Sequence, residues 1–359
     1  MTFQLGEVVW GGYTTQEVAM RMVGQTLTLV TSLIAGGSGA LADIYIPEGD
    51  ANTTLVLSDK FEVLRRIEGL EAVHGLAAIP GRDILLAGSL ATIERGNVQK
   101  PAAASEDEHD AHHGGGQEPM DGTVSIVSAV EAETGEIIKK IEVPGSVHHV
   151  ETSTDGKWAV VTHPGLASVS IIDLGDFSVA ATVATGPEPE YSVYDPVTGR
   201  FFVSNAGNGT VSDVDPEKGY VVRNLVLDNG PKHLAFDSEA RRIFAAEADN
   251  GTVSVIDADS GDTLQRFEIG GELHGIAEGE NVVYVSARET GKIVKVDVAT
   301  GKSSEVSVGP QPYHMTLSDE GLLVSSAAEA LVWVLDPRDL SVRSTIPTQG
   351  IGHQMVVSN

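Results

Sequence analysis

A repeat of about 40 residues runs through the chain and restricts its fold more than any other feature. Each unit holds an alternating apolar strand that ends in Asp, then a polar turn and a second alternating strand. The Asp positions are spaced 42, 42, 40 and 39 residues apart, at Asp173, Asp215, Asp257, Asp297 and Asp336. A further strand pair precedes each Asp, as in HLAFDSEARRIFAAEADNGTV, so one period holds four short strands and no helical pattern. Four-stranded sheets at this period predict an all-β propeller.

The first strand of the unit can be aligned seven times, which predicts seven blades. The aligned segments are VHGLAAI, VHHVETS, EYSVYDP, KHLAFDS, LHGIAEG, YHMTLSD and GHQMVVS. The last segment begins at about His353, so its blade receives one strand from the C-terminus and needs three from residues 43–70. Pairing the two chain ends closes the ring and leaves no open sheet edge. We therefore predict that residues 43–359 form a seven-bladed β-propeller of four-stranded antiparallel blades.

Similar sequence motifs recur in the turns between the strands. Segments such as NAGNGTVSDVD and EADNGTVSVIDADSGDT, and the phrase G-P-x-x-H/Y at blade starts, are typical of the YVTN-repeat propellers, the YncE-like group. Over residues 43–359 the chain resembles this family. The resemblance implies the propeller fold and leaves the chemistry open, because the family hosts many functions.

Histidine recurs at the start of the blades. The second residue of the seven aligned segments is His in six cases and Tyr in one. Since the first strand of each propeller blade lines the central channel, equivalent positions form a ring around it. We predict a ring of six imidazoles and one phenol near one mouth of the channel. Its members are His74, His148, Tyr191, His233, His274, His314 and His353.

Converging neutral imidazoles bind Zn, Cu, Ni or Fe. Two further histidines, His149 and His163, favour blade two as the place of tightest binding, together with His148. Glu190, beside Tyr191, offers a carboxylate. We expect a transition metal in the channel, zinc first and copper next. The alternative is a histidine copied with the repeat and kept for packing, which would leave a protein-interaction scaffold without metal.

An insertion lies in blade one, at about residues 90–121. The spacing from His74 to His148 exceeds the other spacings by about 33 residues, and the extra segment contains EDEHDAHHGGG. Short acidic His-rich tracts bind transition metals weakly and exchange them readily. We predict a second, exchangeable metal site here, or alternatively a solvated acidic loop. Its ligands would be His109, Asp110, His112 and His113.

Three segments carry a second, weaker resemblance. The VHH and THPG segments and the His-rich insertion resemble periplasmic zinc-chaperone propellers that serve ABC-type zinc importers. This resemblance implies metal capture and transfer, with a metal-importer binding protein or another exported protein as the partner. A redox enzyme with a metal or a non-covalent haem-type cofactor is a further alternative, because a channel histidine can be an axial ligand.

No catalytic residues are predicted. A nucleophile elbow and nucleotide fingerprints are missing from the sequence. Propeller lactonases need an Arg near the channel, and none of the seven first strands offers one. The chain has no Cys, which excludes thiolate zinc sites and iron–sulfur clusters. With 51 acidic and 23 basic residues the net charge is −28, which excludes nucleic acid as a partner.

Residues 1–42 predict export. An uncharged stretch from 22 to 42 follows Arg21 and ends in Ala-Leu-Ala, as in a secretory signal peptide. It is too short and too polar for a good membrane span. The alternative is a strand of the folded domain. We expect a periplasmic or extracellular monomer without a membrane span in its mature form.

Overall fold

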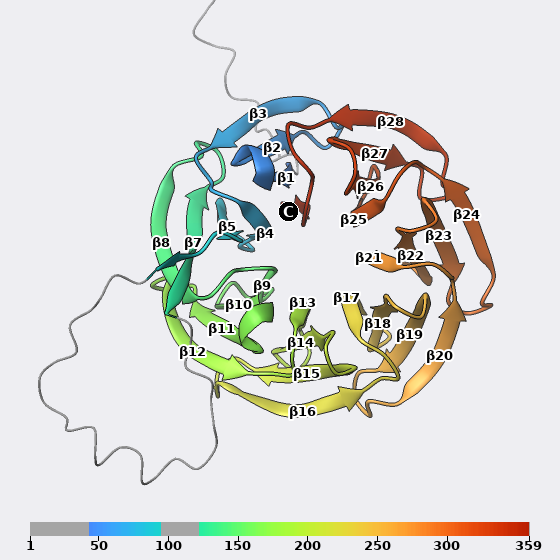
Figure 1. The fold of residues 1–359 in the computed structure, drawn as a ribbon, viewed down its shortest axis with the longest axis horizontal. Coiled ribbons are helices and arrows are strands. Elements are labelled where there is room, and N and C mark those ends of the chain that lie inside the picture. Colours follow the sequence, from blue (N-terminus) through green and yellow to red (C-terminus); the bar gives the residue numbers. More distant parts are fainter. Residues whose placement is uncertain (1–42, 95–121, 359) are drawn as a thin grey trace, which may run out of the picture. The chain divides into compact units, whose positions relative to one another are not determined.

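The computed structural model describes residues 43–94 and 122–358, which form seven antiparallel sheets around a central channel (Figure 1). Six sheets have four strands, and the remaining one carries a fifth, short strand. This arrangement confirms the predicted all-β seven-bladed propeller. Within the described residues, no helix is both long enough and apolar enough to cross a membrane.

The strands follow one another around the ring in chain order, from the channel outward in each blade. Blade 1 contains β4 (Val73–Ala78), β5 (Ile84–Ser89), β7 (Thr123–Glu131), β8 (Ile137–Pro144) and the extra strand β6 (Ile93–Glu94). Blade 2 contains β9 (Val150–Thr152), β10 (Trp158–His163), β11 (Ser168–Asp173) and β12 (Ser178–Ala184). Blade 3 contains β13 (Pro189–Asp195), β14 (Arg200–Asn205), β15 (Thr210–Asp215) and β16 (Tyr220–Val226). Blade 4 contains β17 (Pro231–Asp237), β18 (Arg242–Glu247), β19 (Thr252–Asp257) and β20 (Thr263–Glu268).

The last three blades keep the same plan. Blade 5 contains β21 (Leu273–Gly279), β22 (Val282–Ala287), β23 (Lys292–Asp297) and β24 (Ser303–Ser307). Blade 6 contains β25 (Pro312–Ser318), β26 (Gly321–Ser326), β27 (Leu331–Leu335) and β28 (Val342–Pro347). Blade 7 contains β29 (Val356–Val357), β1 (Ile44–Glu48), β2 (Thr53–Leu57) and β3 (Val63–Glu68). Two short 3₁₀ turns complete the described elements, at Gly49–Ala51 and Pro164–Leu166.

The two ends of the propeller pair with each other in blade 7, as predicted. Strand β29 lies beside β1, with Ile44 opposite Val357, and the sheet order is β29-β1-β2-β3. The backbone N–H of Asp43 donates to Ser358 Oγ at 3.0 Å. The buried carboxylate of Glu48 accepts bonds from Arg66 Nε at 2.9 Å and from the backbone N–H of Gln349 at 2.7 Å. Strand pairing and this carboxylate therefore join the chain ends.

The repeated Asp is a turn residue. Its carboxylate accepts a backbone N–H from the turn that follows, for example Gly175 N–H to Asp173 at 2.7 Å and Thr300 N–H to Asp297 at 2.8 Å. Such side-chain bonds stabilise tight turns between strands. The apolar core lies between the blades: one cluster of buried side chains joins Val127 of β7 and Val143 of β8 in blade 1 with Val161 of β10 in blade 2. The repeat thus codes for turns and core rather than for chemistry.

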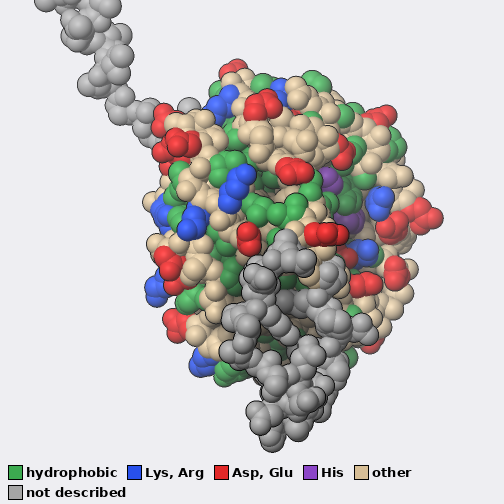
Figure 2. All heavy atoms as spheres, turned by 60° about the vertical axis from the view of Figure 1, so that its left-hand side comes forward, with side chains coloured by type: hydrophobic (Ala, Val, Ile, Leu, Met, Phe, Trp, Pro, Cys, Tyr) green, Lys and Arg blue, Asp and Glu red, His purple; other side chains and the backbone are tan. Residues whose placement is uncertain are grey.

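The charge lies mainly on the outside. Figure 2 shows acidic side chains spread over one face, with Lys and Arg between them. Some basic groups form ion pairs within a blade: Arg200 and Arg223 both pair with the buried Asp213, at 3.1 and 3.0 Å.

Candidate metal centre in the channel

The first strands of most blades contain a bulge next to the channel. Strands β4, β13, β17, β21 and β25 all shift register within three residues of their start. A bulge leaves residues of one strand without a directly opposed partner and re-aims their side chains. Two consecutive residues of the strand can therefore reach the channel.

The histidines occupy both of these consecutive positions, so the prediction of one repeated position was wrong. His74 and His274 are the second residues of β4 and β21. Tyr191, His233 and His314 are the third residues of β13, β17 and β25. An alignment of the sequence by residue identity places His opposite His and takes no account of the extra residue at the bulge.

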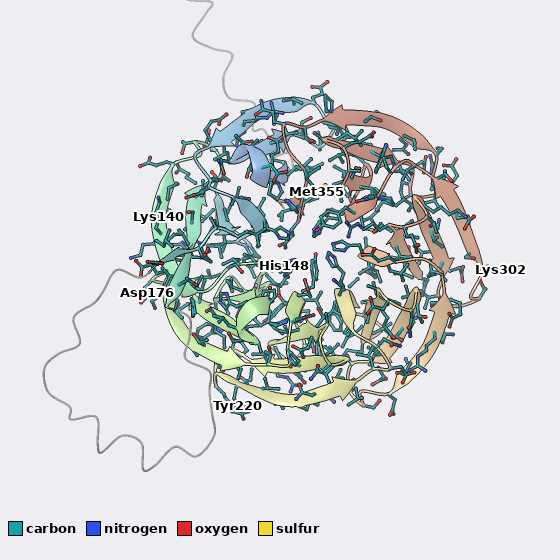
Figure 3. The ribbon with its side chains drawn as sticks, viewed as in Figure 1. Lys140, His148, Asp176, Tyr220, Lys302 and Met355 are labelled. Carbon is teal, nitrogen blue, oxygen red and sulfur yellow. The ribbon has the colours of Figure 1, made fainter. Side chains whose placement is uncertain are left out.

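The rings nevertheless form a series of neighbours around the channel, in which His148 and His149 are joined through the chain rather than by a ring contact. His148 lies beside it at the inner end of blade 2 (Figure 3). Neighbouring ring centroids lie 3.5 to 5.8 Å apart. The pairs are His353–His74, His74–His148, His149–Tyr191, Tyr191–His233, His233–His274, His274–His314 and His314–His353.

Two groups of three imidazoles can each hold a metal ion. In each group the three candidate ligand nitrogens lie within 4.8 Å of one another. The His353 group consists of His74, His314 and His353, and the His274 group consists of His233, His274 and His314. His314 belongs to both. All of these side chains are buried except that of His353, which is partly exposed.

Several ring nitrogens in these groups lack a hydrogen bond. Among the described residues, the buried Nε2 atoms of His233, His274 and His314 and the buried Nδ1 of His353 have no partner. A buried polar atom without a partner costs about 1–3 kcal/mol. His74 differs, because its Nδ1 lies 2.7 Å from the carbonyl oxygen of His148. A carbonyl only accepts, so Nδ1 carries the proton and Nε2 keeps its lone pair free for a metal.

The imidazoles are neutral at physiological pH. Burial, reinforced by neighbouring imidazoles, lowers the pKa of His74, His233, His274 and His314 well below the usual 6.5. Burial also lowers the pKa of His353, to about 4. Because only neutral imidazole binds a metal, these groups are in the binding form without losing a proton.

Blade 2 does not gather the ligands as predicted. His163 uses both ring nitrogens in hydrogen bonds, Nδ1 with the carbonyl oxygen of Ser146 at 3.0 Å and Nε2 with Ser170 Oγ at 2.8 Å. His149 accepts the backbone N–H of Ser192 at its Nδ1, at 3.2 Å, and its buried Nε2 has no partner. Neither belongs to a three-imidazole group, and the groups draw on blades 1, 4, 5, 6 and 7 instead.

His148 and Glu190 form a separate pair beside the ring. His148 Nε2 lies 3.2 Å from Glu190 Oε2, and the side chains are 17% and 16% exposed. Its Nδ1 lies 3.0 Å from the backbone carbonyl oxygen of Glu190, so both ring nitrogens face an oxygen atom of the same residue. The pair therefore offers an imidazole and a carboxylate that solvent can reach. The predicted loop ligands His109, Asp110, His112 and His113 lie outside the described residues.

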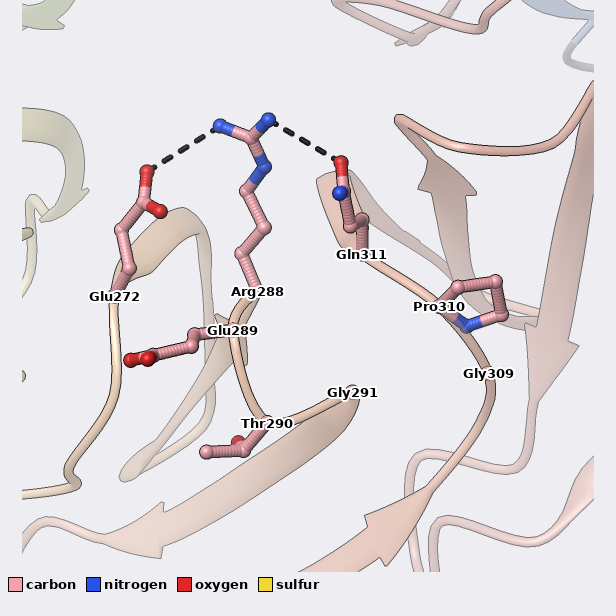
Figure 4. A pocket seen from close by; sticks show the side chains of 8 residues that line it. All are labelled: Glu272, Arg288, Glu289, Thr290, Gly291, Gly309, Pro310 and Gln311. Carbon is pink, nitrogen blue, oxygen red and sulfur yellow. Dashed lines mark hydrogen bonds and ion pairs between the residues drawn. The ribbon is translucent and has the colours of Figure 1, made fainter.

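An arginine lies beside the channel. The sequence argument did not identify it, because that argument considered only the first strand of each blade. Arg288 follows β22 and lines a pocket of about 490 Å³ with Glu272 and Gln311 (Figure 4). Its guanidinium contacts the carboxylate of Glu272 and the amide oxygen of Gln311, both at 3.3 Å. It also lies 5.6 Å above the ring of Tyr313, which stacks on His274 at 4.0 Å.

A carboxyl group was also missed. Glu151 of β9, with Tyr191 and Gln354, lines a second cavity of about 380 Å³. Burial raises the pKa of Glu151 to about 8. No pattern in the sequence distinguishes this residue from the surface acids.

No protein-family profile matches the chain, and no curated protein matches it in sequence. Solved structures do match. The periplasmic gluconolactonase PpgL of Pseudomonas aeruginosa is 17% identical, with a TM-score of 0.66 over 89% of this chain and 99% of that one. A protein of Bacteroides fragilis, provisionally assigned as a 6-phosphogluconolactonase, is 13% identical, with a TM-score of 0.69 over 90% and 100% of the two chains. The dihydro-heme d1 dehydrogenase NirN is 14% identical, with a TM-score of 0.60 over 89% and 66%.

At these identities the likeness establishes the fold alone. The neighbours include proteins named for a lactonase and for a dehydrogenase activity, so the propeller itself selects no chemistry. Membership of the YVTN-repeat family stays a prediction.

Proposed function

We propose that this protein binds a transition-metal ion, zinc first and copper next, at the imidazoles of its channel, and that it captures and hands over the ion outside the cytoplasm. The observation that carries the proposal is the set of unpartnered nitrogens. Four of the five imidazoles in the two groups keep a buried ring nitrogen without a hydrogen bond. His163 bonds both of its ring nitrogens, and the single unpartnered nitrogen of His149 belongs to no group of three, whereas the unpartnered nitrogens of the two groups lie on histidines that converge.

The ligand chemistry favours zinc and copper. Each group offers three neutral nitrogen donors and no carboxylate, which suits these metals and does not suit Ca²⁺ or Mg²⁺. Three protein ligands leave a fourth position open, and an open position allows another ligand to attack and remove the ion. This donor set therefore suits transfer better than permanent structural binding. The expected partner is a metal-importer binding protein or another exported protein.

Hydrolysis of a sugar lactone is the second candidate. It is favoured by Arg288, which lines a pocket of about 490 Å³ beside the channel. Arg288 is already engaged by Glu272, at 3.3 Å, and that contact weakens its availability to a substrate. Turnover of gluconolactone that is lost in Arg288→Ala and persists without metal would favour this candidate.

Metal analysis of untagged protein tests the proposal most directly. We expect zinc or copper in the protein as isolated, and a higher melting temperature when either is added to metal-free protein. A ligand that binds only the folded state at a hundredfold excess over Kd stabilises it by about 2.7 kcal/mol. The triple variant His109→Ala, His112→Ala and His113→Ala should keep this rise, whereas His314→Ala should lose it. Metal-free protein without any rise would contradict the proposal, and a Soret absorption band would favour a haem-type cofactor instead.

A further inference from the structure

We infer that the His353 group and the His274 group are two alternative positions for one ion, and that His314 is the ligand common to both. The ion would pass between the positions by exchanging two ligands while His314 stays bound. This inference rests on the proposed function and adds a route and a stoichiometry to it.

The shared ligand makes simultaneous occupation unfavourable. A neutral imidazole has a lone pair on only one ring nitrogen, because the other carries the proton, so His314 binds one ion at a time; its Nε2 has no hydrogen-bond partner. With metal–nitrogen bonds of about 2.0–2.1 Å, two ions on this nitrogen would lie within about 4 Å of each other. Neither group contains a carboxylate that would offset the repulsion between two such cations. One ion per channel is the consequence.

The two positions differ in their access to solvent. The His353 group includes a partly exposed imidazole, whereas all three imidazoles of the His274 group are buried. His74, in the His353 group, has its ring 4.4 Å from that of His148, which forms the solvent-accessible pair with Glu190. On the other side, the ring of His314 lies 4.8 Å from that of His233. The rings therefore lead from a solvent-accessible pair to a fully buried position.

Exchange at His314 keeps the ion coordinated throughout. In the first position the ion has His74, His314 and His353, and in the second it has His314, His233 and His274. The number of imidazole ligands is three in both, and all of them are neutral, so the move changes neither charge nor donor type. The His353 group then controls loading, and the His274 group controls retention.

The test uses the full-length untagged chain with His109→Ala, His112→Ala and His113→Ala, so that these three histidines do not contribute. Zn²⁺ binding is counted by native mass spectrometry, and Co²⁺ loading is followed by its visible absorption. We expect one tightly bound ion in this background. His314→Ala should weaken binding by more than the roughly 100-fold that loss of an outer-shell partner costs. His149→Ala is the matched control, since its Nε2 is also buried and unpartnered but belongs to neither group.

Two double variants separate the positions. His74→Ala with His353→Ala should keep a retained ion but load it more slowly than the background. His233→Ala with His274→Ala should load at the background rate and release the ion to a chelator faster. If His314→Ala loses its fold by circular dichroism, His314→Gln serves in its place.

Three results would overturn the inference: two tightly bound ions in the background protein, unchanged affinity in the folded His314 variant, or identical loading and release in the two double variants. Failure of the proposed function looks different. In that case the background protein itself binds no Zn²⁺ or Co²⁺, and both proposals fall together.

Discussion

His74 donates its Nδ1 proton to the backbone carbonyl of His148 at 2.7 Å, across the boundary between blades 1 and 2. The bond ties the ring of one blade to the main chain of the next. It fixes the tautomer of His74 and directs the other nitrogen, with its lone pair, away from the backbone. This candidate metal ligand is thus oriented by the packing of two blades, since neither blade alone provides both groups.

Acid should destabilise the metal-free protein. Seven histidines, six of them buried and His353 partly exposed, have lowered pKa values. The unfolded chain therefore takes up protons before the folded protein does as the pH falls below about 6.5, and the free energy of unfolding decreases. For His163, whose pKa is lowered to about 4, the free energy of unfolding falls by an amount on the order of 3 kcal/mol as the pH drops from the ordinary histidine pKa to the lowered one. Glu151, Glu278 and Asp213, whose pKa values are raised mainly by burial, act in the opposite direction, but they are three groups against seven.

Urea unfolding at pH 7.5, 6.0 and 5.0 measures this effect. His163→Asn should show a weaker pH dependence than the parent protein, because Asn can keep a bond to Ser146 or Ser170 and does not titrate. A midpoint that rises toward pH 5 would show that the imidazoles are not held neutral by burial.

Metal binding in the channel should resist mild acid better than binding by ordinary histidines. The channel imidazoles have pKa values well below 6.5, so few protons compete with the metal between pH 7.5 and 5.5. Histidines with the ordinary pKa of about 6.5 would lose affinity over the same range. Competition with a chromophoric chelator at several pH values, on the variant with Ala at 109, 112 and 113, checks this expectation. Affinity that drops steeply from pH 7 would place the bound ion on exposed ligands.

Gln354 should contribute strongly to ring closure. Its side-chain oxygen accepts the backbone N–H groups of Leu76 at 3.1 Å and Val150 at 3.3 Å, and its amide donates to Val150 O at 2.8 Å. Gln354→Ala would leave three buried backbone groups unpaired, at about 1–3 kcal/mol each. We expect a clearly lower urea midpoint. Gln349→Ala is the control, because that side chain is exposed and only its backbone bonds to Glu48; equal losses in the two variants would contradict the assigned role.

Export predicts a processed N-terminus. The uncharged segment 22–42 and its Ala-Leu-Ala end should be removed, so protein recovered from its native host should begin near Asp43. N-terminal sequencing of the periplasmic or culture-medium fraction gives the answer. Recovery of an intact Met1 or Met20 from the cytoplasm would refute export.

The sequence by itself determined the architecture. The features that predict four strands per blade are local in the sequence: alternating strands, an Asp at each turn and a spacing of about 40 residues. They do not depend on contacts between distant parts of the chain. The C-terminal strand without its own blade dictated closure with residues 43–70, because an unpaired edge is unfavourable. The concentration of histidine at blade starts was equally visible.

Only the tertiary structure decided which histidines meet. A bulge depends on how a strand pairs with its neighbour, so the division of the rings between two consecutive positions could not be counted from the sequence. Whether a ring nitrogen is free depends on partners from other strands: Ser146 and Ser170 occupy His163, whereas His314 Nε2 has none. Arg288 reaches the channel edge from the end of a second strand, through a loop whose path the repeat does not encode. Local patterns specify strands and turns, but a site made by several blades exists only once their register and packing are set.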